Sequence, residues 1–251
     1  MEQDRFTPKQ VMLLFAGSVA LMIFTSLSVL AIGIAGVIVV QVTSIAGVSV
    51  VAARLRFGTR AWAVLGLGRP PGRSLVGAAL VGAGFWFINL LLSAPLVEWV
   101  GGDEEIAALG ALISEAPLWL AALSIVVAPA LCEEILLRGV VARSLAARWG
   151  PVLAIVVSAA LFSLFHFSLP RLLPTALLGL LLAYATLQAG SIWPSVLMHA
   201  INNAVALALS AELLPPLADA MMEQPLVCLL GALTLCATGM SLLRNMQQRS
   251  K

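Results

Sequence analysis

Long apolar segments run through the whole chain, and the polar residues between them are few. Residues 10–53 contain no charged side chain, which leaves room for two membrane-crossing helices near 10–30 and 34–53, with Gly33 and Gly36 at the turn. A helix needs about 20 apolar residues to cross the hydrocarbon core of a bilayer. Further spans are expected near 75–97, 118–147, 151–168, 172–189, 192–211 and 225–243. The pattern therefore predicts an all-α, multi-pass transmembrane bundle of about eight spans.

Composition supports this prediction. Of the 251 residues, 61% are hydrophobic and 10% are charged, whereas a soluble domain has about 25% charged residues. We expect one integral membrane domain, 1–251, surrounded by the lipid bilayer and without a nucleic-acid partner. The first apolar run has no small-residue cleavage site, so no cleavable signal peptide is expected. Abundant alanine, glycine and arginine with little lysine favour a bacterial source, and hence the inner membrane.

The distribution of charges predicts the orientation. Short cytoplasmic loops carry an excess of lysine and arginine. With both termini in the cytoplasm, the arginine-rich segment 54–73 and most other basic residues lie inside, and only Arg171 lies outside. Eight of the twelve acidic residues then lie outside, five of them in a loop over 98–115. We therefore expect an even number of spans with both termini cytoplasmic, and we interpret 54–73 as ordinary anchoring rather than a headgroup site.

Three polar segments lie inside apolar runs, where lipid makes ionisable groups costly. A charged side chain at the bilayer centre costs at least ~2.5 kcal/mol, so such groups usually face a protein interior or an aqueous cavity and mark function. The segments are Glu133–Arg138, Phe162–His166 and His199–Asn203, and they contain both histidines of the chain.

The two adjacent glutamates are expected to have different roles. Neighbours on a helix point about 100° apart. Glu134 and Arg138 are four residues apart with the acid first, the preferred order for a helical ion pair. This pairing leaves Glu133 free to face elsewhere. Pro129 is expected to loosen the helix before the pair. Cys132 lies beside the glutamates, but no histidine is adjacent in sequence, so a nucleophilic role is disfavoured.

The two histidine segments each place polar groups on one helix face. Phe162 and His166 are four apart, as are His199 and Asn203, and interhelical hydrogen bonding alone would explain either pair. Counted from the inner helix ends, Glu133 and His166 lie ~21–22 Å deep, and His199 and Asn203 ~10–17 Å. A carboxylate, two imidazoles and an amide that can meet in one layer indicate a reaction centre.

The three segments resemble the motifs EExxxR, FxxxH and HxxxN of the CPBP family, which contains the CAAX prenyl proteases and the bacteriocin-processing or Abi proteins. The motifs occur in the family's order and on separate predicted spans, as Glu133-Glu134…Arg138, Phe162…His166 and His199…Asn203. The resemblance covers about residues 117–210, which would form a catalytic core, and leaves 1–116 as generic N-terminal spans.

The resemblance implies a glutamate-dependent intramembrane endopeptidase, a hydrolase that cuts a peptide bond of a membrane-associated protein or peptide. Glu133 with His166 would activate a water as general base, and His199 with Asn203 would stabilise the oxyanion. The supporting residues would be Glu134, Arg138 and Phe162.

Alternatives remain for the chemistry and for the class of protein. Glu133, His166 and His199 would also make a zinc set of two histidines and one carboxylate. There is no HExxH motif, so no cofactor is favoured and zinc stays an alternative. A non-cleaving membrane scaffold or immunity partner of the same family is the second functional hypothesis, and a proton-coupled transporter is the third. The sequence leaves the substrate, its side of entry and the oligomeric state open.

Overall fold

A computed structural model describes residues 5–244, except for the side chains of residues 103, 105, 106 and 109. Within this part of the chain all regular elements are helices, as predicted. The N-terminal helices are α1 (Pro8–Ser28), α2 (Ala35–Val40), α3 (Val48–Phe57) and α4 (Ala61–Val64), with a π-helical segment, η3 (Gln41–Gly47), between α2 and α3. They are followed by α5 (Gly72–Val100) and α6 (Asp103–Ser114).

A long helix over Leu118–Trp149 lies at the centre of the bundle and is the most buried of the candidate spans. It consists of α7 (Leu118–Ala122), the π-helical η5 (Leu123–Val127), α8 (Ala128–Glu134), the π-helical η6 (Ile135–Ala142) and α9 (Arg143–Trp149). The remaining helices are α10 (Pro151–Leu164), α11 (Leu172–Ala189), α12 (Trp193–Ser210), α13 (Pro215–Glu223) and α14 (Pro225–Arg244).

The structure supports fewer candidate spans than the eight that the sequence predicts. In the described residues, six helices are long and apolar enough to cross a membrane, or seven if the bent pair α12 and α13 is one span. Two predicted spans account for the difference. The helix expected over 151–168 ends at Leu164, and its 14 residues correspond to a length of about 21 Å. A bilayer core is about 30 Å thick.

Local chemistry explains where α10 ends. The imidazole Nδ1 of His166 lies 2.8 Å from the carbonyl oxygen of Phe162 and so occupies an acceptor at the helix end. Phe167 then adopts a positive φ of 49°, a conformation that ends a helix and that non-glycine residues seldom take.

The second difference from the predicted spans is α12. This helix is long and apolar enough to count as a membrane span only together with α13, which it meets at 90°. The predicted acidic loop is also largely a helix, α6.

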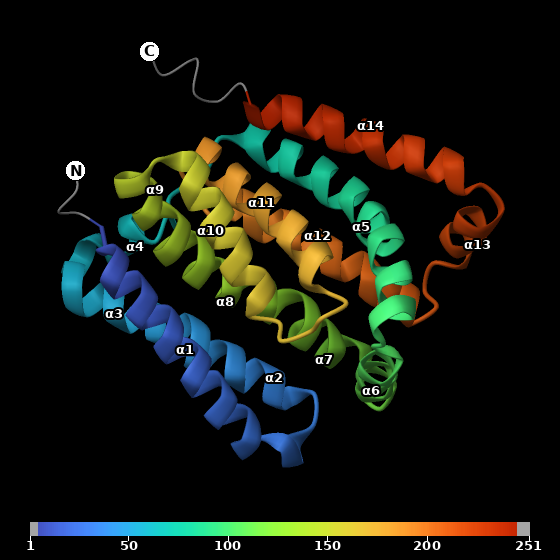
Figure 1. The fold of residues 1–251 in the computed structure, drawn as a ribbon, viewed down its shortest axis with the longest axis horizontal. Helices are drawn as coiled ribbons and strands as arrows, with labels where there is room; N and C mark the ends of the chain where they lie inside the picture. The colour runs from blue at the N-terminus through green and yellow to red at the C-terminus, as the bar shows by residue number, and fades with distance from the viewer. Residues whose placement is uncertain (1–4, 245–251) are drawn as a thin grey trace.

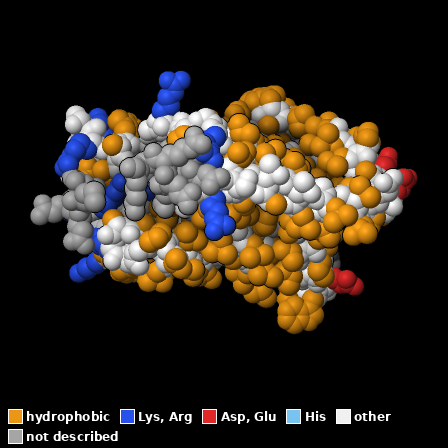
Figure 2. Space-filling view, turned by 90° about the horizontal axis from the view of Figure 1, so that it is seen from above, with side chains coloured by type: hydrophobic (Ala, Val, Ile, Leu, Met, Phe, Trp, Pro, Cys, Tyr) orange, Lys and Arg blue, Asp and Glu red, His pale blue; other side chains and the backbone are white. Residues whose placement is uncertain are grey.

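The two ends of the molecule carry opposite charges. The described chain begins and ends at the same end of the bundle, the left in Figure 1. Figure 2 shows lysine and arginine side chains towards that end and acidic side chains at the opposite end, near α13. Such a separation is typical of a protein that crosses a membrane along this axis. The chain is thus an integral, multi-pass membrane protein, while the cytoplasmic location of the termini stays a prediction.

Small residues allow the C-terminal helix to pack closely on α5. A Cβ added at Gly84 would lie 2.5 Å from the carbonyl oxygen of Ala232, and one added at Gly239 would lie 2.5 Å from that of Gly77. Close approach of backbones at small residues is the usual way in which membrane helices associate. In this way α14 and α12 both pack against α5, which brings α5 to the edge of the candidate site.

Candidate active site

The backbone is widened where the predicted catalytic segment begins. The π-helical segments η5 and η6 flank α8, whose last two residues are Glu133 and Glu134. A third π-helical segment, η3, packs against α8 from the N-terminal part of the chain. Turns of π-helix are rare and often occur at functional sites, because they shift backbone and side-chain groups out of the regular α-helical register.

Glu133 is buried and only half paired. Its side chain is 5% exposed, and its Oε1 accepts a hydrogen bond of 2.7 Å from Nε2 of Gln41 in η3. The second oxygen, Oε2, has no hydrogen-bond partner, and the residue lines a cavity. A carboxylate with one anchored oxygen and one unpaired oxygen beside a cavity is arranged to accept a proton from a molecule inside it.

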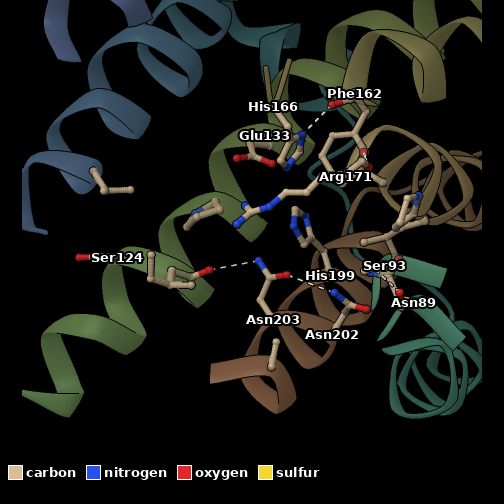
Figure 3. Close-up of a pocket in the computed structure, with 17 residues that line it drawn as sticks. Asn89, Ser93, Ser124, Glu133, Phe162, His166, Arg171, His199, Asn202 and Asn203 are labelled. Atoms are coloured by element: carbon tan, nitrogen blue, oxygen red, sulfur yellow. Dashed lines mark hydrogen bonds between the residues drawn. The ribbon is translucent and has the colours of Figure 1, made fainter. Parts of the chain in front are cut away.

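His166 presents a defined nitrogen to the same cavity. Its Nδ1 lies 2.8 Å from the carbonyl oxygen of Phe162. A carbonyl oxygen can only accept, so Nδ1 carries the hydrogen and Nε2 of the neutral ring carries the lone pair. His166 lines the cavity together with Glu133, and Figure 3 shows the two side chains close together. The loop that ends α10 therefore fixes the tautomer of this imidazole.

Glu134 contacts Arg138 and His199 through one of its carboxylate oxygens. Its Oε1 accepts a hydrogen bond of 2.9 Å from Nη1 of Arg138, and the same oxygen lies 3.1 Å from Nδ1 of His199. Glu134 and Arg138 are both fully buried, so the predicted i,i+4 ion pair is confirmed. Neither residue lines the cavity. Arg138 also donates through Nη2 to the carbonyl oxygen of Gly179, at 3.3 Å.

Phe162 connects the buried ion pair with both imidazoles. The guanidinium of Arg138 lies over the Phe162 ring, 4.5 Å from its centroid. The same ring makes edge-to-face contacts with His166 at 4.8 Å and with His199 at 5.6 Å between centroids. Phe162 is fully buried apart from its contact with the cavity. One aromatic ring thus contacts Arg138 and both imidazoles and also lines the cavity.

Two asparagines of α12 form the far wall of the cavity. Asn203 donates through Nδ2 to the carbonyl oxygen of Ile125 in η5, at 3.1 Å, and Asn202 donates through Nδ2 to Oδ1 of Asn203, at 3.3 Å. Sequence spacing puts Asn202 about 60° from the face shared by His199 and Asn203. Both asparagines nevertheless line the cavity.

The cavity brings the four predicted catalytic residues together. It has a volume of about 380 Å³, and Figure 3 shows how its labelled residues converge on it from several helices. Its lining includes Glu133, His166, His199 and Asn203, and the supporting residue Phe162. Such a volume holds several water molecules or a short stretch of peptide.

The zinc alternative finds no suitable ligand group in this arrangement. In the part of the chain that the structure describes, no three or more histidine, cysteine, aspartate and glutamate side chains are grouped so that they could hold a metal ion. Glu133, His166 and His199 line one cavity without forming such a group.

Sequence reasoning missed several residues of the cavity and one partner of Glu133. Gln41 lies in the first charge-free segment, where it is the only amide between residues 11 and 53, and this isolation could have identified it. Asn89 and Ser93 come from α5 and likewise interrupt an apolar span. Arg171, the one basic residue expected on the outer side, also lines the cavity.

Comparison with known protein families identifies the segment that carries the motifs. The family model described as "Type II CAAX prenyl endopeptidase Rce1-like" matches residues 115–205. These residues are a domain of that family, which confirms the resemblance to CPBP proteins drawn from the three motifs. No significant match was found among curated proteins or among solved structures. Gln41, Asn89 and Ser93 lie outside the matched residues.

Proposed function

We propose that the protein is a glutamate-dependent intramembrane endopeptidase that hydrolyses a peptide bond of a membrane-associated protein or peptide. One observation carries the proposal: Glu133, whose Oε2 has no hydrogen-bond partner, lines the same cavity as His166, whose Nε2 is not engaged by the Phe162 carbonyl. The family that matches residues 115–205 is described as an endopeptidase family, which supports the proposal.

The chemistry begins with a water between Glu133 and His166. One O–H of the water points to Oε2 of Glu133 and the other to Nε2 of His166, which leaves an oxygen lone pair for the scissile carbonyl. As the oxygen attacks the carbonyl carbon, its proton moves to Glu133. The tetrahedral intermediate then collapses, the C–N bond breaks, and Glu133 returns the proton to the leaving amine nitrogen.

His199 and Asn203 serve the oxyanion of the intermediate. Asn203 uses one Nδ2 hydrogen for the Ile125 carbonyl, and its second hydrogen is available to the cavity. His199 donates through Nδ1 to Glu134, so its Nε2 donates to the oxyanion when the ring carries both protons. Glu134 compensates the charge of that ring, and Arg138 in turn compensates Glu134. Hydrogen bonds to an oxyanion are strong in a site from which bulk water is excluded.

Two competing functions predict different behaviour. A scaffold or immunity partner would bind a peptide without cutting it, although this chain keeps every residue of the three motifs. A proton-coupled transporter would move protons with its substrate.

The proposal includes a substrate class and a location. We propose a membrane protein or peptide as the substrate of the peptidase, and the inner membrane of a bacterium as its location.

The decisive experiment compares protein termini in membranes from cells that carry the wild type, Glu133→Gln or Glu115→Gln. Glu133→Gln removes the base at nearly constant volume, and the exposed Glu115, which does not line the cavity, provides a matched control. We expect new membrane-protein termini with the wild type and Glu115→Gln, and none with Glu133→Gln at equal expression. Identical termini in all three samples would refute the protease. Loss of the cut on chelation, with recovery on added zinc, would identify the metal-dependent alternative.

A further inference from the structure

A second cavity adjoins the catalytic one through a shared wall. It has a volume of about 500 Å³ and lies between α5, α12 and α13. Four residues line both cavities: Asn89, Ser93, Asn202 and Ala206. The rest of the second cavity, here called the α13 groove, is mainly apolar and includes Trp86, Leu90, Leu209, Met221 and Met222.

The two asparagines of the shared wall each contain an acceptor oxygen without a described donor. Oδ1 of Asn202 and Oδ1 of Asn89 are both buried atoms without a hydrogen-bond partner, and the Asn202 side chain is 7% exposed. The amide nitrogen of Asn202 is held by Asn203. The Ser93 hydroxyl donates to the carbonyl oxygen of Asn89 at 2.8 Å, which leaves only lone pairs for the wall. Buried acceptors of this kind are costly unless a ligand supplies N–H or O–H groups.

A substrate that unwinds inside a membrane needs acceptors for its backbone N–H groups. A peptide bond within a transmembrane helix must leave the helix before water can attack it, and each unwound residue exposes a backbone N–H that lipid cannot pair. The donors of an extended peptide therefore match the acceptors of the shared wall. The hydrogen bond between Asn202 and Asn203 also ties this wall to the proposed oxyanion site, so it lies next to the bond that is cut.

We propose that Asn89 and Asn202 form a substrate subsite: their Oδ1 atoms accept hydrogen bonds from backbone N–H groups of an extended stretch of substrate beside the scissile bond. The α13 groove holds the adjoining residues of that stretch. Its aromatic, leucine and methionine lining fits a large apolar side chain, since methionine adapts to varied shapes. This inference rests on the proposed peptidase activity and adds the direction in which the substrate leaves the catalytic cavity, towards α13.

The test uses a synthetic peptide that spans a cleavage site found with the wild type and absent with Glu133→Gln. Single backbone nitrogens of the peptide are N-methylated in turn, and kcat/KM is measured with the wild type, Asn89→Leu and Asn202→Leu. Gln224→Leu removes an exposed amide just beyond α13 and serves as the control. We expect methylation at one or two positions near the cut to lower wild-type kcat/KM about tenfold each, as loss of one hydrogen bond does.

The coupling between peptide and variant decides the result. With Asn89→Leu or Asn202→Leu the unmodified peptide should be cut about tenfold more slowly, and methylation at the corresponding nitrogen should then have no further effect. Asn89 contacts none of the proposed catalytic groups through a described hydrogen bond, so its variant is the cleaner of the two. Equal methylation penalties in the wild type and both leucine variants would overturn the subsite while leaving the peptidase intact. Absence of any Glu133-dependent cut would overturn both.

Discussion

Replacing Arg138 with alanine should destabilise the fold through the charge it leaves behind. The guanidinium is fully buried and donates to Glu134 at 2.9 Å and to the Gly179 carbonyl at 3.3 Å. It also lies 4.5 Å from the centre of the Phe162 ring. The substitution removes all three interactions and opens a cavity. Glu134 then remains buried, and His199 is its only described hydrogen-bond partner.

The size of the effect follows from these contacts. A hydrogen bond to a charged group contributes about 1.5–3 kcal/mol, and a desolvated cation–π contact contributes about 2 kcal/mol. The two hydrogen bonds and the ring contact would add to about 5–8 kcal/mol if they were independent. They share one guanidinium and so do not add in full, and removing one partner of a buried ion pair costs about 3–5 kcal/mol. We expect a decrease of this size in the free energy of unfolding for Arg138→Ala.

A double variant separates charge from packing. Glu134→Gln with Arg138→Met removes both charges and keeps most of the volume, and such replacements of buried pairs are often close to neutral. Unfolding of the purified proteins in mixed detergent should show the double variant recovering most of the stability lost in Arg138→Ala. Cleavage should stay impaired in the double variant, because His199 loses its carboxylate partner. A single variant destabilised by less than ~1 kcal/mol, or a double variant no more stable than the single, would contradict the buried-pair argument.

Two further predictions concern residues that the motifs do not include. Gln41→Leu should lower kcat about 10–100-fold, because Glu133 loses the donor that orients its Oε1. It should also lower stability by about 1–3 kcal/mol, because the carboxylate stays buried without that donor; unchanged kcat in the cleavage assay would exclude a positioning role. Gly179→Ala should lower stability by about 1–3 kcal/mol, because its Cβ would lie 2.9 Å from Cα of Ala159. Gly231→Ala, with nothing within 4 Å, should not, and equal unfolding of the two variants would contradict the packing.

The helices and the ion pair could be predicted because each depends on neighbours in the sequence. Apolar runs located the helical segments, and the four-residue spacing located the contact between Glu134 and Arg138. The number of membrane spans could not be predicted in the same way. It depends on where α10 stops, which is set by a side-chain contact of His166 with Phe162, and on a 90° bend between α12 and α13. Hydropathy does not record either feature.

Depth along the helices predicted that four side chains would meet: Glu133, His166, His199 and Asn203. It did not predict the hydrogen-bond partners of these side chains. Gln41 reaches Glu133 across 92 positions of sequence, and the Ile125 carbonyl reaches Asn203 across 78. Both contacts start from π-helical segments, η3 and η5. A widened turn follows from tertiary packing rather than from residue type, so no local pattern predicts which groups it redirects.

The adjacent glutamates show how one short segment can meet two opposed requirements. A base needs an oxygen that is not already engaged by a donor, whereas a buried charge in a membrane needs compensation. Glu134 does not line the cavity and is paired with Arg138 and His199, and the ring of Phe162, which does line it, covers Arg138. Glu133 keeps one oxygen unpaired and is held by a neutral amide instead of a cation. An arginine in place of Gln41 would form an ion pair with Glu133, whereas the neutral amide fixes one oxygen and leaves the charge of the carboxylate uncompensated by that partner.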